Sequence, residues 1–192
     1  RRVGDALELT GADGRTLSTA GVVFWGTGRP PRPRGLGLEA LGVELDARGF
    51  VRTDEFENTT TPGIFAVGDI TGKKELTPVA IAAGRKLADR LFGGQADAQL
   101  DYCDVPTVLF SHPPIGTVGF SEEAARARYE KVRVYQAEFT DTYHRFSHRA
   151  VKTTMKLVCV DENERVVGIH VIGRSADEML QGFAVALKMG AT

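Results

Sequence analysis

The segment that most constrains the fold of this chain is residues 59–94, where a short apolar run is followed by a turn and then by a helix pattern. The run Ile64–Val67 is typical of a strand buried on both faces, and it ends at Gly68 and Asp69. A buried carboxylate is costly unless hydrogen bonds satisfy it. The sequence therefore predicts either a turn that presents Asp69 to a polar ligand or a plain surface aspartate between a strand and a helix.

The pattern after this turn predicts a helix over residues 77–92. Thr77 is expected as its N-cap and Pro78 at its first helical position, while Gly93 and Gly94 should end it. The N–H groups at a helix start have no partner within the helix, so they attract an anion or an electron-rich oxygen. A ligand held at the aspartate turn would find these donors as well.

One face of this helix carries Thr77, Ile81 and Arg85, because these residues are spaced by four. If Thr77 faces a cofactor, Arg85 faces the same cavity one to two turns away. A guanidinium group there could hold a substrate carboxylate through two parallel hydrogen bonds. The alternative is a solvent-exposed arginine on a helix of mixed charge.

The N-terminal part of the chain predicts a strand, a tight turn at residues 11–14 and a second strand. Val22–Trp25 is a continuous apolar run, which is expected to form a strand buried on both faces. The Pro-rich stretch 29–34 fits neither a helix nor a central strand, and we interpret it as a crossing between domains. Residues 35–40 match the spacing of a dinucleotide fingerprint, but that motif needs a strand directly before it, so the match is rejected.

From residue 105 onward the pattern changes to five short strand-like runs. These runs are 105–110, 115–120, 131–139, 153–161 and 165–173. Helices are expected over 121–129, where Ser121 is the cap, and over about 175–189. The turn at 161–164 predicts a hairpin between the last two runs. This half is expected to be an α+β domain with an antiparallel sheet.

The composition argues against several functions. The 192 residues carry a net charge of -1, which gives no support for nucleic-acid binding. No apolar run approaches the roughly 20 residues of a membrane span. The histidines show no metal-ligand spacing, and Cys103 and Cys159 are 56 positions apart, which fits neither a redox pair nor a zinc site. Two reduced structural thiols are expected, as in a cytoplasmic protein.

Two long stretches of the chain resemble a known family. Residues 59–92 resemble the second FAD-binding segment of the class I pyridine nucleotide-disulfide oxidoreductases, and residues 105–125 resemble the opening of their C-terminal dimerisation domain. Within the family, residues 111–119 and 177–192 are similar to the members that reduce glutathione disulfide. The resemblance implies an α/β plus α+β fold, in which the second half of an FAD-binding Rossmann-like domain precedes an α+β dimerisation domain with an antiparallel sheet.

The resemblance implies three parts. Residues 1–31 would end an NADPH-binding domain, 32–102 would be the second segment of the FAD-binding domain, and 103–192 would be a dimerisation domain truncated at its C-terminus. It also implies a homodimer formed through residues 103–192. Both ends of the chain are expected to be cuts, because the family's first FAD fingerprint, redox cysteine pair and acid/base histidine are missing.

For FAD, the resemblance assigns roles to three residues. Asp69 would hydrogen-bond to the ribityl chain of FAD. The backbone at Leu76 and Thr77 would meet the pyrimidine edge of its ring. Reduction places negative charge near that edge, and a helix N-terminus stabilises such charge.

For NADPH and the disulfide substrate, the resemblance assigns five more residues. Gly28, Glu75 and Val108 match positions beside NADPH. Arg85 matches the arginine that binds a glutathione carboxylate, and Ile81 would line the same pocket. No residue of this chain is assigned to catalysis or to a metal.

The implied activity is NADPH-dependent reduction of glutathione disulfide by an FAD enzyme that maintains cell redox homeostasis. The isolated chain is expected to be inactive, because it lacks the redox-active residues. Thr142 stands where a methionine is expected near the disulfide, so another disulfide substrate stays open. A non-catalytic dimerisation module is the second alternative, although Asp69, Thr77 and Arg85 would then serve no purpose.

Overall fold

A computed structural model describes residues 2–4, 6–20, 22–24, 26–146, 148 and 151–192. The chain divides into two compact units, residues 1–100 and 101–192. Each unit is described by itself. The division into three domains that the resemblance implies stays a prediction.

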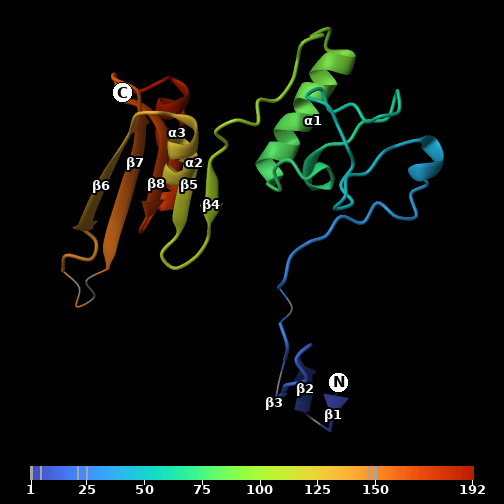
Figure 1. Cartoon of the computed structure of the whole chain (residues 1–192), viewed down its shortest axis with the longest axis horizontal. Helices are drawn as coiled ribbons and strands as arrows, with labels where there is room; N and C mark the ends of the chain where they lie inside the picture. Colours follow the sequence, from blue (N-terminus) through green and yellow to red (C-terminus); the bar gives the residue numbers. More distant parts are fainter. Residues whose placement is uncertain (1, 5, 21, 25, 147, 149–150) are drawn as a thin grey trace. The chain divides into compact units, whose positions relative to one another are not determined.

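The first unit opens with a small antiparallel sheet, drawn in blue in Figure 1. Its strands are β1 (Arg2–Val3), β2 (Ala6–Thr10) and β3 (Thr16–Ala20), in that order. The expected tight turn joins β2 to β3, and it is closed by a hydrogen bond from the Gly11 N–H to the Arg15 carbonyl at 2.8 Å. The prediction of strand, turn and strand is confirmed.

The apolar run after β3 does not form the expected buried strand. Val22 and Phe24 are 92% and 93% exposed and have no strand conformation, while Trp25 lies outside the described residues. A strand buried on both faces needs neighbouring strands and covering side chains. Across the described residues, no strand pairs with this run, so its backbone forms no hydrogen bonds of a β-sheet.

The segment Ile64–Val67 is extended but is not a regular strand, which corrects the second strand prediction. Its pairing is limited to one bridge between Asn58 and Phe65. The Ala66 N–H bonds to the Glu57 carbonyl at 3.2 Å, and the Thr59 N–H bonds to the Ile64 carbonyl at 3.1 Å. These four residues are only partly buried, because the described chain supplies a partner on one side alone.

Three helical elements follow in the described part of the first unit. They are the 3₁₀ turns η1 (Glu39–Leu41) and η2 (Gly68–Thr71) and the helix α1 (Thr77–Phe92). The bounds predicted for α1 are confirmed, and Gly93 follows its end. The predicted cap is wrong by one residue: Leu76, with the extended angles φ -133° and ψ 127°, is the N-cap. Thr77 is therefore the first helical residue, and Pro78 follows it at the second position.

The second unit is built on a five-stranded antiparallel sheet in the order β4-β5-β8-β7-β6. The strands are β4 (Thr107–Leu109), β5 (Ile115–Gly119), β6 (Val132–Thr140), β7 (Lys152–Val160) and β8 (Arg165–Ile172). All five predicted strands are confirmed. The predicted hairpin is confirmed as well, since β7 pairs with β8 in antiparallel register and has a bulge at Val158 and Cys159.

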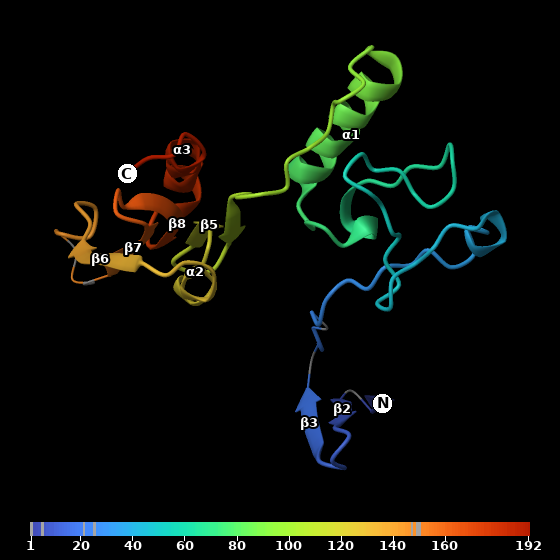
Figure 2. The ribbon, with the colours of Figure 1, turned by 45° about the horizontal axis from the view of Figure 1, so that its top comes forward.

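Two helices cover opposite faces of this sheet, as Figure 2 shows with α3 on one side and α2 on the other. The short helix α2 (Glu122–Arg128) is capped as predicted, because the Ser121 Oγ accepts a hydrogen bond from the Ala124 N–H at 3.1 Å. The longer helix α3 (Ala176–Lys188) buries Leu180 completely. Adjacent strand residues divide between the faces: Val166 packs in the core under α3 and Val167 in the core under α2.

Candidate functional site

The turn that carries Asp69 requires glycine at its first position. Gly68 is buried and has a φ of +79°, a left-handed conformation that residues with a Cβ rarely adopt. A Cβ added to Gly68 would lie 3.0 Å from the Cβ of Ala80 in α1. The backbone of η2 therefore packs directly on the first turns of α1. Asp69 itself is exposed, so its carboxylate keeps its hydration and can accept hydrogen bonds from a ligand.

The start of α1 presents backbone donors next to this turn. Thr77 and Val79 have N–H groups without an acceptor inside the helix, and Pro78 has none to offer. The first N–H with an intrahelical partner belongs to Ala80, which donates to the Leu76 carbonyl at 3.0 Å. The positive end of the helix dipole also lies here. A carboxylate acceptor and backbone donors that are not used within the helix thus border the same contact between η2 and α1.

One face of α1 is open to solvent. Thr77, Ile81 and Arg85 are all exposed, with Ile81 at 50%, whereas Val79 and Ala83 are buried on the other side. The expectation that these three residues share a face agrees with this pattern. The face combines a long cation with an apolar side chain, so it can contact a ligand that has both a carboxylate and aliphatic parts.

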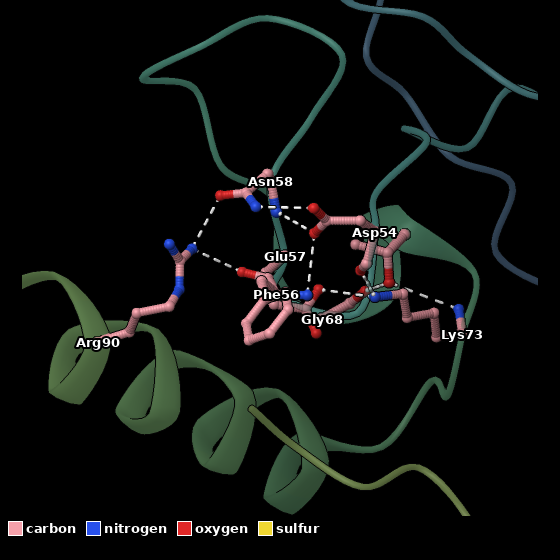
Figure 3. Close-up of polar contacts among 8 residues, drawn as sticks. Asp54, Phe56, Glu57, Asn58, Gly68, Lys73 and Arg90 are labelled. Carbon is pink, nitrogen blue, oxygen red and sulfur yellow. Dashed lines mark hydrogen bonds and ion pairs between the residues drawn. The ribbon is translucent and has the colours of Figure 1, made fainter. Parts of the chain in front are cut away.

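Behind the turn lies a buried ion pair that sequence reasoning missed. Glu57 is 3% exposed and has a φ of +63°. The Lys73 Nζ donates to the Glu57 Oε2 at 3.1 Å and to the Asp54 carbonyl at 2.6 Å (Figure 3). Lys73 belongs to the loop between η2 and α1. Its side chain therefore fastens this loop to residues 54–57.

Asp54 organises the loop that holds this lysine. Its Oδ1 accepts hydrogen bonds from the N–H groups of Phe56 and Asn58, both at 2.9 Å, and its Oδ2 accepts one from the Asn58 Nδ2 at 2.7 Å. Burial acts to raise the pKa of Asp54, but the hydrogen bonds from Asn58 and Phe56 outweigh it, so the pKa lies below its usual value. The carboxylate stays charged and the loop stays folded around it.

Arg90 ties the far end of α1 to the same loop. Its Nη2 donates to the Phe56 carbonyl and to the Asn58 Oδ1, both at 2.8 Å (Figure 3). The guanidinium also lies over the rings of Phe56 and Phe65, at 5.7 and 5.6 Å from their centroids. Among the described residues, no partner is found for the buried Arg90 Nε. The only sequence signal for this network was an aspartate and an asparagine four residues apart in a turn.

The residues expected beside NADPH are placed in both units. Gly28 is exposed with a φ of +124°, and a Cβ there would meet no atom within 4 Å. Glu75 is exposed just before α1. Val108 lies in β4 opposite Gly116 and packs partly against the core under α3. Their grouping into one site stays a prediction.

Three further features of the described residues concern metal-binding side chains, long apolar helices and thiols. Among these residues, no cluster of three histidine, cysteine, aspartate or glutamate side chains could hold a metal ion. No helix described here is long and apolar enough to cross a membrane. Cys103 is exposed and Cys159 is buried, and both are free thiols.

The residues around Asp69 fit the part of FAD that the resemblance implies. A polyol chain needs an acceptor for its hydroxyl groups, and the exposed Asp69 carboxylate provides one. The carbonyl oxygens at a ring edge need donors, which the start of α1 provides. The glycine at position 68 allows the turn that carries Asp69 to lie directly against the start of α1.

Comparisons with known proteins identify the family of this chain. A model of the family "Pyridine nucleotide-disulphide oxidoreductase" matches residues 1–84, and a model of the dimerisation domain of the same family matches residues 105–192. The glutathione reductase of Schizosaccharomyces pombe is 45% identical over 184 residues, which are 94% of this chain and 39% of that protein.

Two solved structures share the fold. Both are the HOCl-induced flavoprotein disulfide reductase RclA from Escherichia coli, and both are 22% identical to this chain. Its Cu(II) complex has a TM-score of 0.83 and covers 100% of this chain, and the other structure has a TM-score of 0.82 and covers 98%. In each case the match takes up 43% of the RclA chain. The present chain therefore spans about two fifths of the relatives it matches.

Proposed function

Because the chain belongs to the pyridine nucleotide-disulphide oxidoreductase family, we propose that it forms part of an NADPH-dependent flavoenzyme that reduces glutathione disulfide. The overall reaction consumes NADPH, a proton and one glutathione disulfide, and it yields NADP⁺ and two glutathione thiols. The observation that carries the proposal is the Asp69 turn packed on the open start of α1. The similarity to a glutathione reductase at 45% identity supports the choice of substrate.

In this proposal, the chain's own residues bind and orient the flavin. Asp69 accepts hydrogen bonds from ribityl hydroxyl groups, and the backbone at Leu76 and Thr77 donates to the pyrimidine edge of the ring. The dipole of α1 stabilises negative charge at that edge. Bound FAD would supply the electron transfer from NADPH towards the disulfide.

The substrates would be held by other residues of the chain. Arg85 would form a bidentate ion pair with a glutathione carboxylate, and Ile81 would contact its aliphatic part. Both side chains are exposed on one face of α1. Gly28, Glu75 and Val108 would lie beside NADPH.

A second copy of the protein is the proposed partner. The match of residues 105–192 to a dimerisation domain supports a homodimer formed through residues 103–192. The two free thiols fit a reducing compartment such as the cytoplasm.

A substrate panel tests this function. The full-length protein is purified, its bound flavin is identified by absorption and mass, and NADPH oxidation is followed with several disulfides. We expect FAD and the highest kcat/KM with glutathione disulfide. A clear preference for another disulfide would favour the alternative that Thr142 raises. Failure to bind FAD or to oxidise NADPH with any disulfide would contradict the proposal.

A further inference from the structure

We propose that Glu57, Lys73 and Arg90 are positioning residues for flavin, because they fix the loop and the helix that would present Asp69 and Thr77. The inference rests on the proposed function, since it assumes that the Asp69 turn and the start of α1 bind FAD. It adds three residues that do not themselves contact the cofactor. Their effect would pass through the backbone between η2 and α1.

The place of Lys73 in the chain makes it suited to this role. Lys73 lies four residues after Asp69 and four residues before Thr77. It is therefore the midpoint of the loop that connects the proposed ribityl acceptor to the proposed ring donors. The Lys73 Nζ lies 3.1 Å from the Glu57 Oε2 and 2.6 Å from the Asp54 carbonyl oxygen. These two hydrogen bonds hold the middle of the loop in place, and both the Asp69 side and the Thr77 side of the loop extend from it.

The burial of this pair argues for a positional role. The side chains of Lys73 and Glu57 are only 24% and 4% exposed. Apolar residues in place of a buried ion pair are often neutral for stability or stabilising. Glu57 also has a left-handed φ of +63°, a conformation that persists only where its surroundings hold it. Stability alone therefore does not explain why charged residues occupy these positions.

Arg90 fixes the direction of the helix. It lies in the last turn of α1 and binds the Phe56 carbonyl and the Asn58 Oδ1, both at 2.8 Å. Thr77 and Arg90 are 13 residues apart in sequence, which is about 20 Å along a helix. Lys73 just before α1 and Arg90 at its end are thus held by the same loop, residues 54–58 (Figure 3). Because the contacts of Lys73 and Arg90 hold both ends of α1, they fix the direction of the helix axis and therefore the direction of the N–H groups at its start.

The test compares a buried pair with a matched exposed pair in the full-length protein. The double variant Lys73→Met with Glu57→Gln removes both charges of the buried pair together. The control is Arg52→Met with Glu44→Gln, because that ion pair has the same 3.1 Å distance but side chains that are 62% and 60% exposed. For each apoprotein, the dissociation constant for FAD is measured by quenching of flavin fluorescence, and the thermal midpoint is measured separately.

We expect the buried double variant to keep its thermal midpoint and to bind FAD about tenfold more weakly, which is the lower end of the loss seen when the hydrogen-bond partners behind metal ligands are removed. The control should bind FAD like the wild type. Equal affinity in the wild type and in a folded buried double variant would overturn the inference and leave the proposed function intact. If the wild-type apoprotein itself does not bind FAD, the proposed function fails first.

A second variant keeps the test decisive if the double variant does not fold. Glu57→Asp retains the negative charge and tolerates a left-handed φ, but its shorter side chain draws Lys73 to a new position. A positioning role predicts a several-fold weaker FAD affinity for this variant. A role limited to charge compensation predicts no change in affinity, and that result would overturn the inference.

Discussion

The substitution Gly68→Ala tests the geometry on which the candidate site depends. Alanine at a φ of +79° is strained, and the left-handed region costs a residue with a Cβ about 1 kcal/mol or more. Its methyl group would also lie 3.0 Å from the Cβ of Ala80, and relieving such overpacking costs about 1 kcal/mol more. We therefore expect a local destabilisation of about 2 kcal/mol at the contact between η2 and α1.

Hydrogen exchange at the Ala80 amide measures this effect, because that amide forms the first hydrogen bond inside α1. Gly63→Ala is the matched control: Gly63 has a φ of +81°, but a Cβ there would meet nothing within 4 Å. The control should show the cost of strain alone, about 1 kcal/mol, at its own turn. Adding Ala80→Gly to Gly68→Ala should recover the packing part, measured as a coupling between the two changes. Unchanged exchange at Ala80 in Gly68→Ala would refute the reasoning.

Three further predictions concern other parts of the chain. The hydrogen bond from Lys188, together with those from Cys103, lowers the pKa of Asp101 from 3.8 to about 2. The stability that the Lys188 contact gives the end of α3 is therefore present above pH 3.8 and is lost as the pH falls through about 2. Asp101→Asn should remove this pH dependence from the exchange of α3 amides. Ser121→Ala removes the cap that accepts the Ala124 N–H and should cost α2 about 1 kcal/mol, seen as faster exchange in its first turn. Arg85→Lys should raise KM for glutathione disulfide by roughly tenfold with a small change in kcat, because a single ammonium group does not reproduce the bidentate fork; an unchanged KM would exclude a carboxylate contact at Arg85.

Elements with strong local signals could be predicted from the sequence. The bounds of α1 followed from a proline near its start and a glycine pair at its end. The hairpin of β7 and β8 followed from two apolar runs joined by a polar turn. In both cases the residues that decide the structure are close together in the sequence, so the pattern and the fold agree.

Elements that depend on distant partners could not be predicted in the same way. Val22–Phe24 and Ile64–Val67 both have the composition of buried strands, but a strand also needs neighbours, and the described chain provides none for the first run and a partial one for the second. The composition of a segment shows that it can form a strand, but it does not show whether a neighbouring strand is present to pair with it.

The candidate site shows the same limit. The Asp69 turn and the open face of α1 could be located from short motifs. The buried pair of Glu57 and Lys73 could not, because its members are 16 residues apart and each looks like an ordinary surface charge in the sequence. Arg90 reaches Phe56 across 34 residues, and only the folded loop brings them together.

A crystal structure of the full-length protein with FAD tests the central claim most directly. The account predicts an oxygen of the Asp69 carboxylate within about 3 Å of a ribityl hydroxyl group, and the N–H groups at the start of α1 directed at the pyrimidine edge of the ring. An Asp69 carboxylate that points into solvent, with the flavin bound elsewhere or absent, would contradict it.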